Sequence, residues 1–403
     1  MSKTVINDPV YGFISIPRGL LRSIVGHPFF QRLDRISQLG TSAVVYPGAR
    51  HTRRAHSLGA YHLCDEAFRS LAEKGEFLFD SEVEQTEAAI LMHDLGHGPF
   101  SHVLESVFTP GISHEMISLR MMERINDEMH GELSMAVSIF KDEHPKRWLH
   151  ELLSSQLDVD RLDYLCRDSF YTGVREGNVG AERIIKMLAV CNDRLVVNHK
   201  GIYSVENYLL TRRLMYWQVY LHKTTVSAEE VLRLALRRAK WLAQRGEELP
   251  CSDDLRYFLY CSEVPSLDDE DFLFHFARLD DSDILCALKA WELYPDAVLA
   301  TLSRNFVERR LFKVDVHDEP ITAEAVEGYV NEIASALGLT ADEARWMVST
   351  RRVKTELYSE TAGGIEILDI DGTVRPLSEV SHVVRNETAG LLDEKHYLFH
   401  QRL

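Results

Sequence analysis

One stretch of the chain decides its fold class and carries most of its chemistry. Residues 92–102 read Met92-His93-Asp94-Leu95-Gly96-His97-Gly98-Pro99-Phe100-Ser101-His102. One His-Asp pair means little in a chain with 18 histidines, but three histidines beside a carboxylate in so short a stretch favour a divalent metal site. Adjacent His93 and Asp94 can both reach one ion only where a helix is ending, as Gly96 implies. The stretch therefore predicts a helix end beside a metal.

Helical periodicity lies on both sides of this stretch. Residues 51–71 form one predicted helix, and a second begins at a cap formed by Asp80 or Ser81. The inward stripes are His56, Ala60, Leu63, Ala67 and Leu71 in the first helix, and Val83, Thr86, Ile90 and His93 in the second. Each stripe aims a histidine inward. Pro99 fits the first position of a further helix over 100–107.

The remaining pattern predicts a mainly α (α+β) fold with small β-hairpins. Further helices are expected at 113–128, 131–142, 146–168, 180–191 and 205–224, and capping boxes at Ser227-x-x-Glu230 and Thr340-x-x-Glu343 open two more. Hairpins are expected at 4–16, at 195–203 with a turn at Lys200-Gly201, and at 365–377 with a turn at Asp371-Gly372, followed by a closing strand at 396–400. We expect two domains, 1–240 and 241–403, and interpret the acidic stretch 264–283 as a boundary or exposed loop.

Composition limits the class of protein. The 403 residues are 45% hydrophobic, which excludes wholesale disorder. The sequence has no apolar run long enough to cross a bilayer and no Cys-x-x-Cys pair, and its start, Met1-Ser2-Lys3-Thr4, lacks the apolar stretch of a signal peptide. We therefore expect a soluble, cytoplasmic protein without a membrane partner or a cysteine zinc site. Net charge is −17, yet residues 1–60 hold eight lysines and arginines against two acids. A local basic pocket in an acidic body suits a small polyanion.

Completing the metal coordination requires ligands from outside residues 92–102. His56 is one candidate, and an aspartate in Gln156-Leu157-Asp158-Val159-Asp160-Arg161-Leu162-Asp163-Tyr164 is the other. Residue types alone do not choose between Asp158 and Asp160. If the segment is helical, Asp160 shares a side with Tyr164 and Asp168, whereas we expect Asp158 to be a cap or an exposed acid.

Two more groupings point to catalysis and phosphate binding. His102 and Glu105 lie three residues apart on the helix that follows Pro99, so they can form a hydrogen bond. On the helix at 205–224, four residues project from one face, where two cations suit phosphate oxygens and an aromatic ring suits a sugar. These are Arg212, Tyr216, Tyr220 and Lys223.

Together these motifs resemble the HD-domain deoxynucleoside triphosphate triphosphohydrolases, a dGTPase-like family. The resemblance rests on Arg53-x-x-His56-Ser57-Leu58-Gly59, on the stretch from His93 to His102, and on Asp158-Val159-Asp160-Arg161-x-x-Tyr164-x-x-x-Asp168. It runs from about Val5 to Lys223, continues more faintly to the terminal hairpin, and is similar to the catalytic domain of the vertebrate member, which also carries a sterile-alpha-motif domain. It implies a helical HD core.

The resemblance also assigns roles, residue by residue. The metal ligands it implies are His56, His93, Asp94 and Asp160. The catalytic residues it implies are a dyad of His102 and Glu105, with His97 and His114 along the phosphates. The substrate-binding residues it implies are Gln38 and Leu39 at the 3′-hydroxyl, Arg53, Arg212, His222 and Lys223 at the phosphates, Tyr164, Asp168 and Tyr220 at the sugar, and Arg161, which stands where the vertebrate member has Lys.

The implied reaction is metal-dependent hydrolysis of a dNTP. A metal-activated water attacks the α-phosphorus and releases deoxynucleoside and inorganic triphosphate. Among Mg, Mn, Zn, Fe and Ni the sequence does not choose. The family also implies a homo-oligomer, dimer or tetramer, and a nucleotide effector; because Gly26 and Asp34 stand where the vertebrate member binds its guanine nucleotide with an Asp and an Arg, we expect no activation of that type.

Two alternatives stay open. The metal motif alone suits any HD-type phosphohydrolase, including one acting on nucleoside monophosphates, a cyclic dinucleotide or a nucleic-acid end. What favours dNTPs is the further match at Gln38-Leu39, Arg53 and the helical stripe. The second alternative is a low-turnover regulator that binds single-stranded nucleic acid, which the basic first 60 residues permit.

Overall fold

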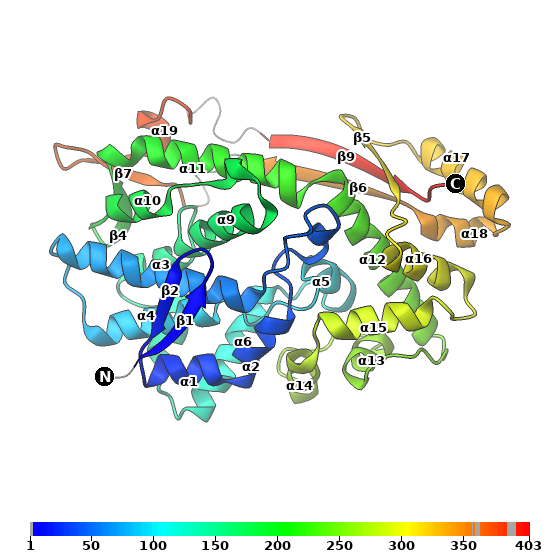
Figure 1. The fold of residues 1–403 in the computed structure, drawn as a ribbon, viewed down its shortest axis with the longest axis horizontal. Helices are drawn as coiled ribbons and strands as arrows, with labels where there is room; N and C mark the ends of the chain where they lie inside the picture. The colour runs from blue at the N-terminus through cyan, green and yellow to red at the C-terminus, as the bar shows by residue number, and fades with distance from the viewer. Residues whose placement is uncertain (1–2, 357, 359–362, 385–391) are drawn as a thin grey trace.

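In the part of the chain that the structure describes, helices predominate and three small sheets lie among them (Figure 1). The computed structural model describes residues 3–356, 358, 363–384 and 392–403. The mainly α fold class is confirmed. The expected hairpin at 4–16 is also confirmed: β1 (Thr4–Asp8) pairs antiparallel with β2 (Gly12–Ile16), with Thr4 opposite Ile16.

The first half of the chain contains the helices that position the motifs. They are α1 (Leu20–Gly26), α2 (Pro28–Arg32), α3 (Arg53–Glu73), α4 (Asp80–Met92), α5 (His102–Phe108), α6 (His114–Glu128), α7 (Ser134–Phe140), α8 (Arg147–Leu153), α9 (Val159–Thr172) and α10 (Ala181–Met187). The predicted helices at 51–71, 80–93, 113–128 and 131–142 correspond to α3, α4, α6 and α7. Because α3 packs against both α4 and α9, histidines and carboxylates from three separate segments meet.

The starts of two helices differ from the prediction. α4 is capped by Phe79 rather than Asp80 or Ser81, because the Glu82 side chain accepts a hydrogen bond from the Phe79 backbone N–H at 3.0 Å. The helix expected from residue 100 begins instead at His102, since Phe100 has a positive φ of 50° and does not continue a right-handed helix.

The predicted helix 146–168 is wrong, because the chain forms two helices there. α8 ends at Leu153, and α9 starts at Val159 after Asp158, whose Oδ1 accepts a hydrogen bond from Arg161 N at 2.7 Å. Asp158 is thus the buried N-cap of α9, in agreement with the cap interpretation and not with an exposed acid.

The hairpin predicted at 195–203 lies earlier in the chain, at 188–198. β3 (Leu188–Cys191) takes the end of the helix expected to reach 191, and it pairs with β4 (Arg194–Asn198) through a turn at Asn192 and Asp193, both with positive φ. Asn and Asp tolerate this left-handed conformation, so they form the turn and Lys200-Gly201 do not.

The predicted helix 205–224 is also interrupted. α11 (Ile202–Met215) passes into a π-helical stretch at Tyr216–Tyr220, and α12 (Lys223–Ala243) begins after His222, whose Nδ1 accepts a hydrogen bond from Thr224 N. Ser227 therefore lies inside α12 and does not open a helix, because its hydroxyl donates to the Phe312 carbonyl at 2.8 Å. The expected 1–240 and 241–403 division falls within α12 and stays a prediction.

The second half adds more helices and completes two sheets. The helices are α13 (Asp253–Tyr260), α14 (Glu270–Arg278), α15 (Asp281–Trp291), α16 (Ala297–Val307), α17 (Ala323–Leu337), α18 (Ala341–Ala344) and α19 (Leu377–Val380). The stretch 264–283 is not simply an exposed loop, because α14 buries Phe272 and Phe276. The capping box at Thr340 and Glu343 is confirmed at α18.

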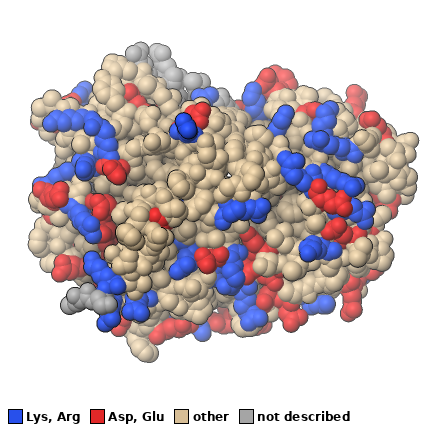
Figure 2. Space-filling view, in the orientation of Figure 1, with Lys and Arg blue, Asp and Glu red and all other residues tan. Residues whose placement is uncertain are grey.

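The C-terminal strands agree with the predictions at 365–377 and 396–400. β7 (Glu366–Leu368) and β8 (Val374–Pro376) form the hairpin, and β7 pairs parallel with β4 to give the order β3-β4-β7-β8. β9 (Leu392–His400) lies between β5 (Lys313–His317) and β6 (Val348–Glu356). Basic and acidic side chains are intermingled around the edges of the face in Figure 2, whose middle shows few of either. None of the described helices is long and apolar enough to cross a membrane.

Candidate metal centre and active site

Three predicted metal ligands meet where α3, α4 and α9 come together. His56 lies in the first turn of α3, His93 is the C-cap of α4, and Asp160 lies in the first turn of α9. One ligand atom from each lies within 4.8 Å of the others. Thr52 caps α3 and Asp158 caps α9, so His56 and Asp160 each project from a first turn that a side chain fixes.

Asp94, the fourth predicted ligand, adjoins this cluster. Its Oδ2 lies 3.8 Å from His56 Nε2 and its Oδ1 lies 3.4 Å from His93 Nε2. Burial would raise the pKa of Asp94, but the charges of His97, His93 and Arg53 hold this pKa well below its usual range. Asp94 is therefore a buried, ionised carboxylate beside two imidazoles.

The donor set fits a divalent metal. His93 Nδ1 lies 2.6 Å from the Ile90 carbonyl, which places the proton on Nδ1. Its Nε2 is buried and has no hydrogen-bond partner among the described residues. Two imidazole nitrogens and two carboxylates within a few ångströms match the ligands that borderline and hard divalent ions take.

Proton affinities in the cluster agree with this assignment. Burial alone would lower the pKa of His56, but hydrogen bonds to Asp160 and Asp163 raise it to about 10. Burial would raise the pKa of Asp160, whereas the neighbouring His56 and His93 imidazoles hold it well below its usual range. Protons and a cation therefore compete for the same place between these imidazoles and carboxylates.

A second group of predicted residues lies on the α5 and α6 side of the cluster. The rings of His97 and His114 stack with centroids 3.9 Å apart, and His97 Nε2 lies 3.3 Å from Asp94 Oδ1. Glu105 Oε1 accepts a hydrogen bond from the His114 backbone N–H at 3.0 Å. The expected hydrogen bond between His102 and Glu105 is not formed, because the two atoms are 3.7 Å apart and His102 is largely exposed.

Predicted sugar-contacting residues lie on the α9 side. The Tyr164 ring is 6.5 Å from that of His56 and 6.1 Å from that of Tyr220. Tyr220 in turn donates a hydrogen bond from its hydroxyl to Asp168 Oδ2 at 2.7 Å. The aromatic pair thus extends from the candidate metal ligand His56 to the Asp168 carboxylate.

The remaining predicted substrate-binding residues have fewer contacts with the candidate metal ligands. Arg161 donates from Nε to the Ser155 carbonyl and to Asp158, so these groups compete for it with any phosphate. Burial raises the pKa of the Tyr164 phenol, and the charges of Arg161 and Arg212 oppose this rise. Lys223 begins α12 and Arg212 lies in α11, so the regular helix from which the four-residue face was predicted is interrupted, and the shared face stays a prediction.

Leu39 and Gln38 lie near His51, and His222 lies near Tyr46. Gln38 N donates to the His51 carbonyl at 3.0 Å, and Leu39 is half-buried. The ring of His222 lies 6.3 Å from that of Tyr46.

Three contacting residues were missed by the sequence reasoning. Asp163 Oδ2 lies 2.7 Å from His56 Nδ1, His51 Nε2 lies 2.7 Å from Asp168 Oδ1, and Ser101 accepts a hydrogen bond from Arg53 Nη2 at 2.8 Å. Asp163 had a signal, because it lies three residues after Asp160 and four before an arginine. His51 and Ser101 had none beyond their nearness to the motifs.

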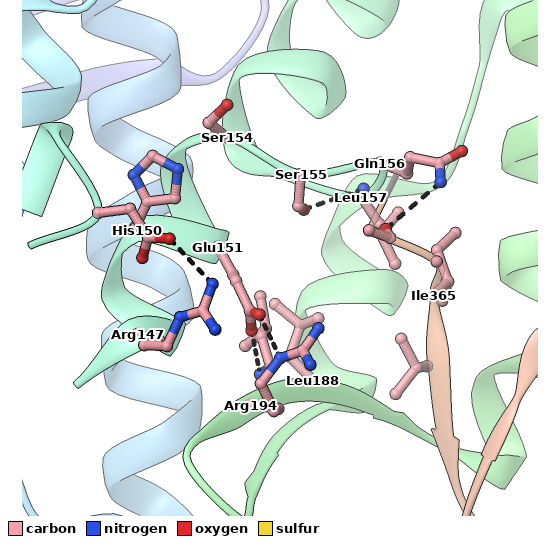
Figure 3. A pocket seen from close by; sticks show the side chains of 15 residues that line it. Arg147, His150, Glu151, Ser154, Ser155, Gln156, Leu157, Leu188, Arg194 and Ile365 are labelled. Atoms are coloured by element: carbon pink, nitrogen blue, oxygen red, sulfur yellow. Dashed lines mark hydrogen bonds and ion pairs between the residues drawn. The ribbon is translucent and has the colours of Figure 1, made fainter. Parts of the chain in front are cut away.

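A separate cavity of about 230 Å³ lies between α8, β4 and β7 (Figure 3). Its lining includes none of the predicted site residues. Arg147 and Arg194 at this cavity pair with Asp142 and Glu151, so its charges already have partners. The candidate metal ligands gather at α3, α4 and α9 and not at this cavity.

Comparison with known families identifies the chain. The HD domain model matches residues 53–168, which hold all four metal-ligand candidates, and the HD associated region model matches residues 179–389. The chain belongs to the HD-domain family. The expected family resemblance is therefore confirmed.

Relatives of this HD-domain chain extend the comparison. A crystal structure of a phosphohydrolase from Bacteroides thetaiotaomicron is 53% identical, with a TM-score of 0.96 over 100% of both chains. The uncharacterized protein YwfO of Bacillus subtilis is 37% identical over 77% of this chain and 71% of its own length. Motif, fold and relatives together support phosphohydrolase activity with a divalent metal.

More distant relatives carry a substrate in their name. Human deoxynucleoside triphosphate triphosphohydrolase SAMHD1 is 33% identical over 54% of this chain and 42% of its own length, and the Dictyostelium discoideum homolog is 30% identical over 65% and 54%. The chain thus spans about half the length of these SAMHD1 relatives.

Proposed function

We propose that this HD-domain phosphohydrolase cleaves dNTPs to deoxynucleoside and inorganic triphosphate. The observation that carries the proposal is a set of buried polar atoms with no hydrogen-bond partner among the described residues. Within the predicted site these atoms are Gln38 Oε1, Arg53 Nε, His93 Nε2, His97 Nδ1, His114 Nδ1 and Arg212 Nη1. Each such atom is costly to leave unpaired, so their gathering in one site favours a polar ligand.

The available atoms suit the parts of a deoxynucleotide. Arg53 and Arg212 keep N–H donors for phosphoryl oxygens, and His97 and His114 offer ring nitrogens beside them. Gln38 Oε1 is an acceptor for a sugar hydroxyl. The tyrosines at 164 and 220 provide flat faces against the deoxyribose.

A divalent metal held by His56, His93, Asp94 and Asp160 would lower the pKa of a coordinated water and polarise a phosphoryl oxygen. Arg53 hydrogen-bonds Asp94 and faces the same ligands, so it neutralises charge next to the α-phosphate. In the proposed step a water oxygen bonds to the α-phosphorus, the bond from phosphorus to the 5′-oxygen breaks, and a proton passes to the 5′-oxygen. Three phosphates then leave together.

Product analysis tests this proposal directly. We expect each hydrolysed dNTP, with Mn²⁺ or Mg²⁺, to give equal amounts of deoxynucleoside and triphosphate, and reaction in H₂¹⁸O to put the label into triphosphate. Orthophosphate with dNDP, or label in the deoxynucleoside, would contradict the proposal. Hydrolysis of nucleoside monophosphates, cyclic dinucleotides or nucleic-acid ends in place of dNTPs would favour the other HD-type reactions.

The charge of the first 60 residues suggested a nucleic-acid-binding regulator as an alternative. The contacts of these residues support that alternative less well. Arg32 and Arg53 are buried, and Arg35 and Arg54 pair with Asp280 and Asp34. Fewer of these cations are therefore free for a phosphate backbone. Salt-dependent binding of single strands that survives loss of the metal ligands would nevertheless favour this alternative.

We further propose a homo-oligomer, dimer or tetramer, without activation by a guanine nucleotide of the vertebrate type. Asp34, which stands where a cation would meet that nucleotide, pairs with Arg54 at 3.6 Å and carries the wrong charge. Light scattering across a range of protein concentrations measures the oligomer. A dNTP hydrolysis rate that rises steeply with GTP would contradict the expectation about activation.

A further inference from the structure

His56 is held firmly on the side away from the other metal-ligand candidates. Its Nδ1 lies 2.7 Å from Asp163 Oδ2, and both side chains are buried. An ionised carboxylate only accepts hydrogen bonds, so this contact places the imidazole proton on Nδ1. The Nε2 atom is thereby left facing Asp160, 3.0 Å away, and Asp94.

Asp163 is held in turn by an arginine one turn further along α9. Arg167 donates from Nε to Asp163 Oδ2 at 3.0 Å and from Nη2 to Oδ1 at 3.1 Å. This two-point contact fixes the plane of the carboxylate as well as its position. Because the Arg167 side chain is completely buried, the pair has little freedom to rearrange.

The same guanidinium reaches the N-terminal hairpin. Arg167 Nη1 donates to Asp8 Oδ2 at 2.8 Å, and the guanidinium lies 5.6 Å from the centre of the Tyr11 ring. The other oxygen of Asp8 accepts hydrogen bonds from the backbone N–H groups of Val10 and Tyr11 at the hairpin turn. One buried cation therefore joins the turn between β1 and β2 to the carboxylate behind His56.

The helix that carries His56 leaves room for this arrangement. Gly59 lies one turn after His56 on α3, and a Cβ atom there would lie 2.0 Å from Asp163 Oδ1 and 2.2 Å from Arg167 Nη2. Any larger residue at this position would push the pair away from the helix. Close approach of α3 and α9 thus depends on a glycine directly beside the pair.

We infer that Asp163 is a positioning residue for the metal ligand His56, and that Arg167 and Asp8 couple its position to the N-terminal hairpin. The inference rests on the proposed role of His56 as a metal ligand. A carboxylate behind a ligating histidine fixes the ring and strengthens it as a donor, so losing it weakens metal binding. Displacement of the hairpin weakens metal binding through the same contacts.

The test measures Mn²⁺ binding to the full chain by calorimetry after metal removal, without any substrate. Asp163→Asn is expected to raise the Mn²⁺ dissociation constant roughly 10- to 100-fold. Asp8→Asn, which changes a residue outside α3, α4 and α9, is expected to raise it less, by at least about threefold. Asp8→Asn also keeps the inference testable if Asp163→Asn does not fold.

Asp296→Asn is the matched control. Asp296 also pairs through both oxygens with a buried arginine, Arg238, but it caps α16. It is expected to lower the melting temperature and leave Mn²⁺ affinity unchanged. A folded Asp163→Asn variant with wild-type affinity would overturn the positioning role, and an Asp8→Asn variant that behaves like Asp296→Asn would overturn the coupling. Neither result depends on whether dNTPs are the substrate.

Discussion

Arg53 and Asp94 share a hydrogen bond of 2.6 Å from Nη1 to Oδ2, so a candidate phosphate-binding residue is tied to a candidate metal ligand. The second Nη of Arg53 donates to Ser101. We expect Arg53→Lys to lower kcat/KM for dNTP hydrolysis roughly 10²-fold, because an ammonium cannot keep both contacts and also serve a phosphate. Mn²⁺ affinity should be retained, since the four candidate metal ligands remain.

Steady-state kinetics and calorimetry on the same preparation check this separation. Arg54→Gln is the control, because Arg54 is the next residue and contacts Asp34 instead. It should match the wild type in both measurements. Loss of Mn²⁺ binding in Arg53→Lys would show that Arg53 acts by holding Asp94 and not by binding phosphate.

Removal of one ligand should remove the metal. His93→Ala deletes a ring nitrogen that faces both Asp94 and Asp160, at 3.4 and 3.6 Å. We expect this variant to retain no metal after dialysis, as measured by mass spectrometry, and to hydrolyse no dNTP. In the wild type, EDTA should abolish activity, and added Mn²⁺ should restore it.

His317→Ala provides the control for the loss of a histidine. His317 is exposed on β5, remote in sequence from the motifs. Its metal content and activity should equal those of the wild type. Normal metal content in His93→Ala would remove His93 from the ligand set.

The contrast between helix 146–168 and the metal ligands shows what the sequence determines. Local periodicity located α3, α4 and α6, because each has a long apolar stripe. It did not separate α8 from α9, because the whole segment 146–168 has a helical pattern. The second helix begins only where Asp158 caps it. The turn at Asn192 and Asp193 was missed for a similar reason, since several polar pairs nearby could form a turn.

Contacts in the candidate site could be predicted between residues that are close in sequence. Contacts between segments that are far apart in sequence were harder to predict. His93 and Asp94 are adjacent, but the contact between His56 and Asp163 joins residues 107 positions apart. Nothing in a single sequence fixes that pairing, because it depends on how α3 and α9 cross. The geometry of His102 and Glu105 was wrong because a helix register predicts proximity, not the rotamers that decide a hydrogen bond.

Glu105 should matter for turnover more than for stability. Its side chain accepts from the His114 backbone and lies 3.7 Å from the Nδ1 atoms of both His102 and His114. The nearby His102 and His114 side chains and the His114 backbone N–H hold the pKa of Glu105 well below its usual range, although burial would raise it, so Glu105 is ionised at neutral pH. We expect Glu105→Gln to lower kcat roughly 10²-fold, a typical effect for proton-transfer or positioning groups.

Glu123→Gln, which changes a glutamate of α6 outside the predicted site, is the control for this change. Both variants should bind Mn²⁺ normally, and only Glu105→Gln should lose turnover in a single-turnover assay. Wild-type kcat in Glu105→Gln would exclude the predicted dyad. Loss of folding, judged by circular dichroism, would instead assign Glu105 a structural role.

Glu87 on α4 should make the folded protein less stable at higher pH. Burial, with Asp65 and Glu84 nearby, raises the pKa of Glu87 to about 8, while Arg69 and Lys3 oppose this rise. The unfolded chain loses this proton near pH 4.3, so stability falls as pH rises between about 4.3 and 8. Glu87→Gln removes the ionisation and should gain on the order of 2 kcal/mol relative to wild type between pH 5 and 8.

Glu82 on the same helix supplies a control of opposite sign. Burial would raise the pKa of Glu82, but its hydrogen bonds with Lys146 and the Phe79 backbone lower it. Its contribution is present above the unfolded pKa and is lost as pH falls. Glu82→Gln should therefore destabilise more at pH 8 than at pH 4 in denaturant unfolding, whereas a Glu87→Gln gain that did not grow with pH would contradict the assignment.

Gly96 should tolerate no side chain, because helix α6 passes directly over it. A Cβ atom there would lie 2.0 Å from the His114 carbonyl oxygen and 2.4 Å from Ser118 N, and the Gly96 N–H already donates to the Ser118 hydroxyl. Backbone cannot move aside as a side chain can, so we expect Gly96→Ala to lower the free energy of unfolding by about 3 kcal/mol. Gly328→Ala, in an exposed part of α17 with open space around its Cβ, should instead raise it by about 0.5–1 kcal/mol. Urea unfolding of both variants measures these changes in the free energy of unfolding. If Gly96→Ala were as stable as the wild type, α6 could not lie against residue 96. The stacking of His97 on His114 would then lose its structural basis.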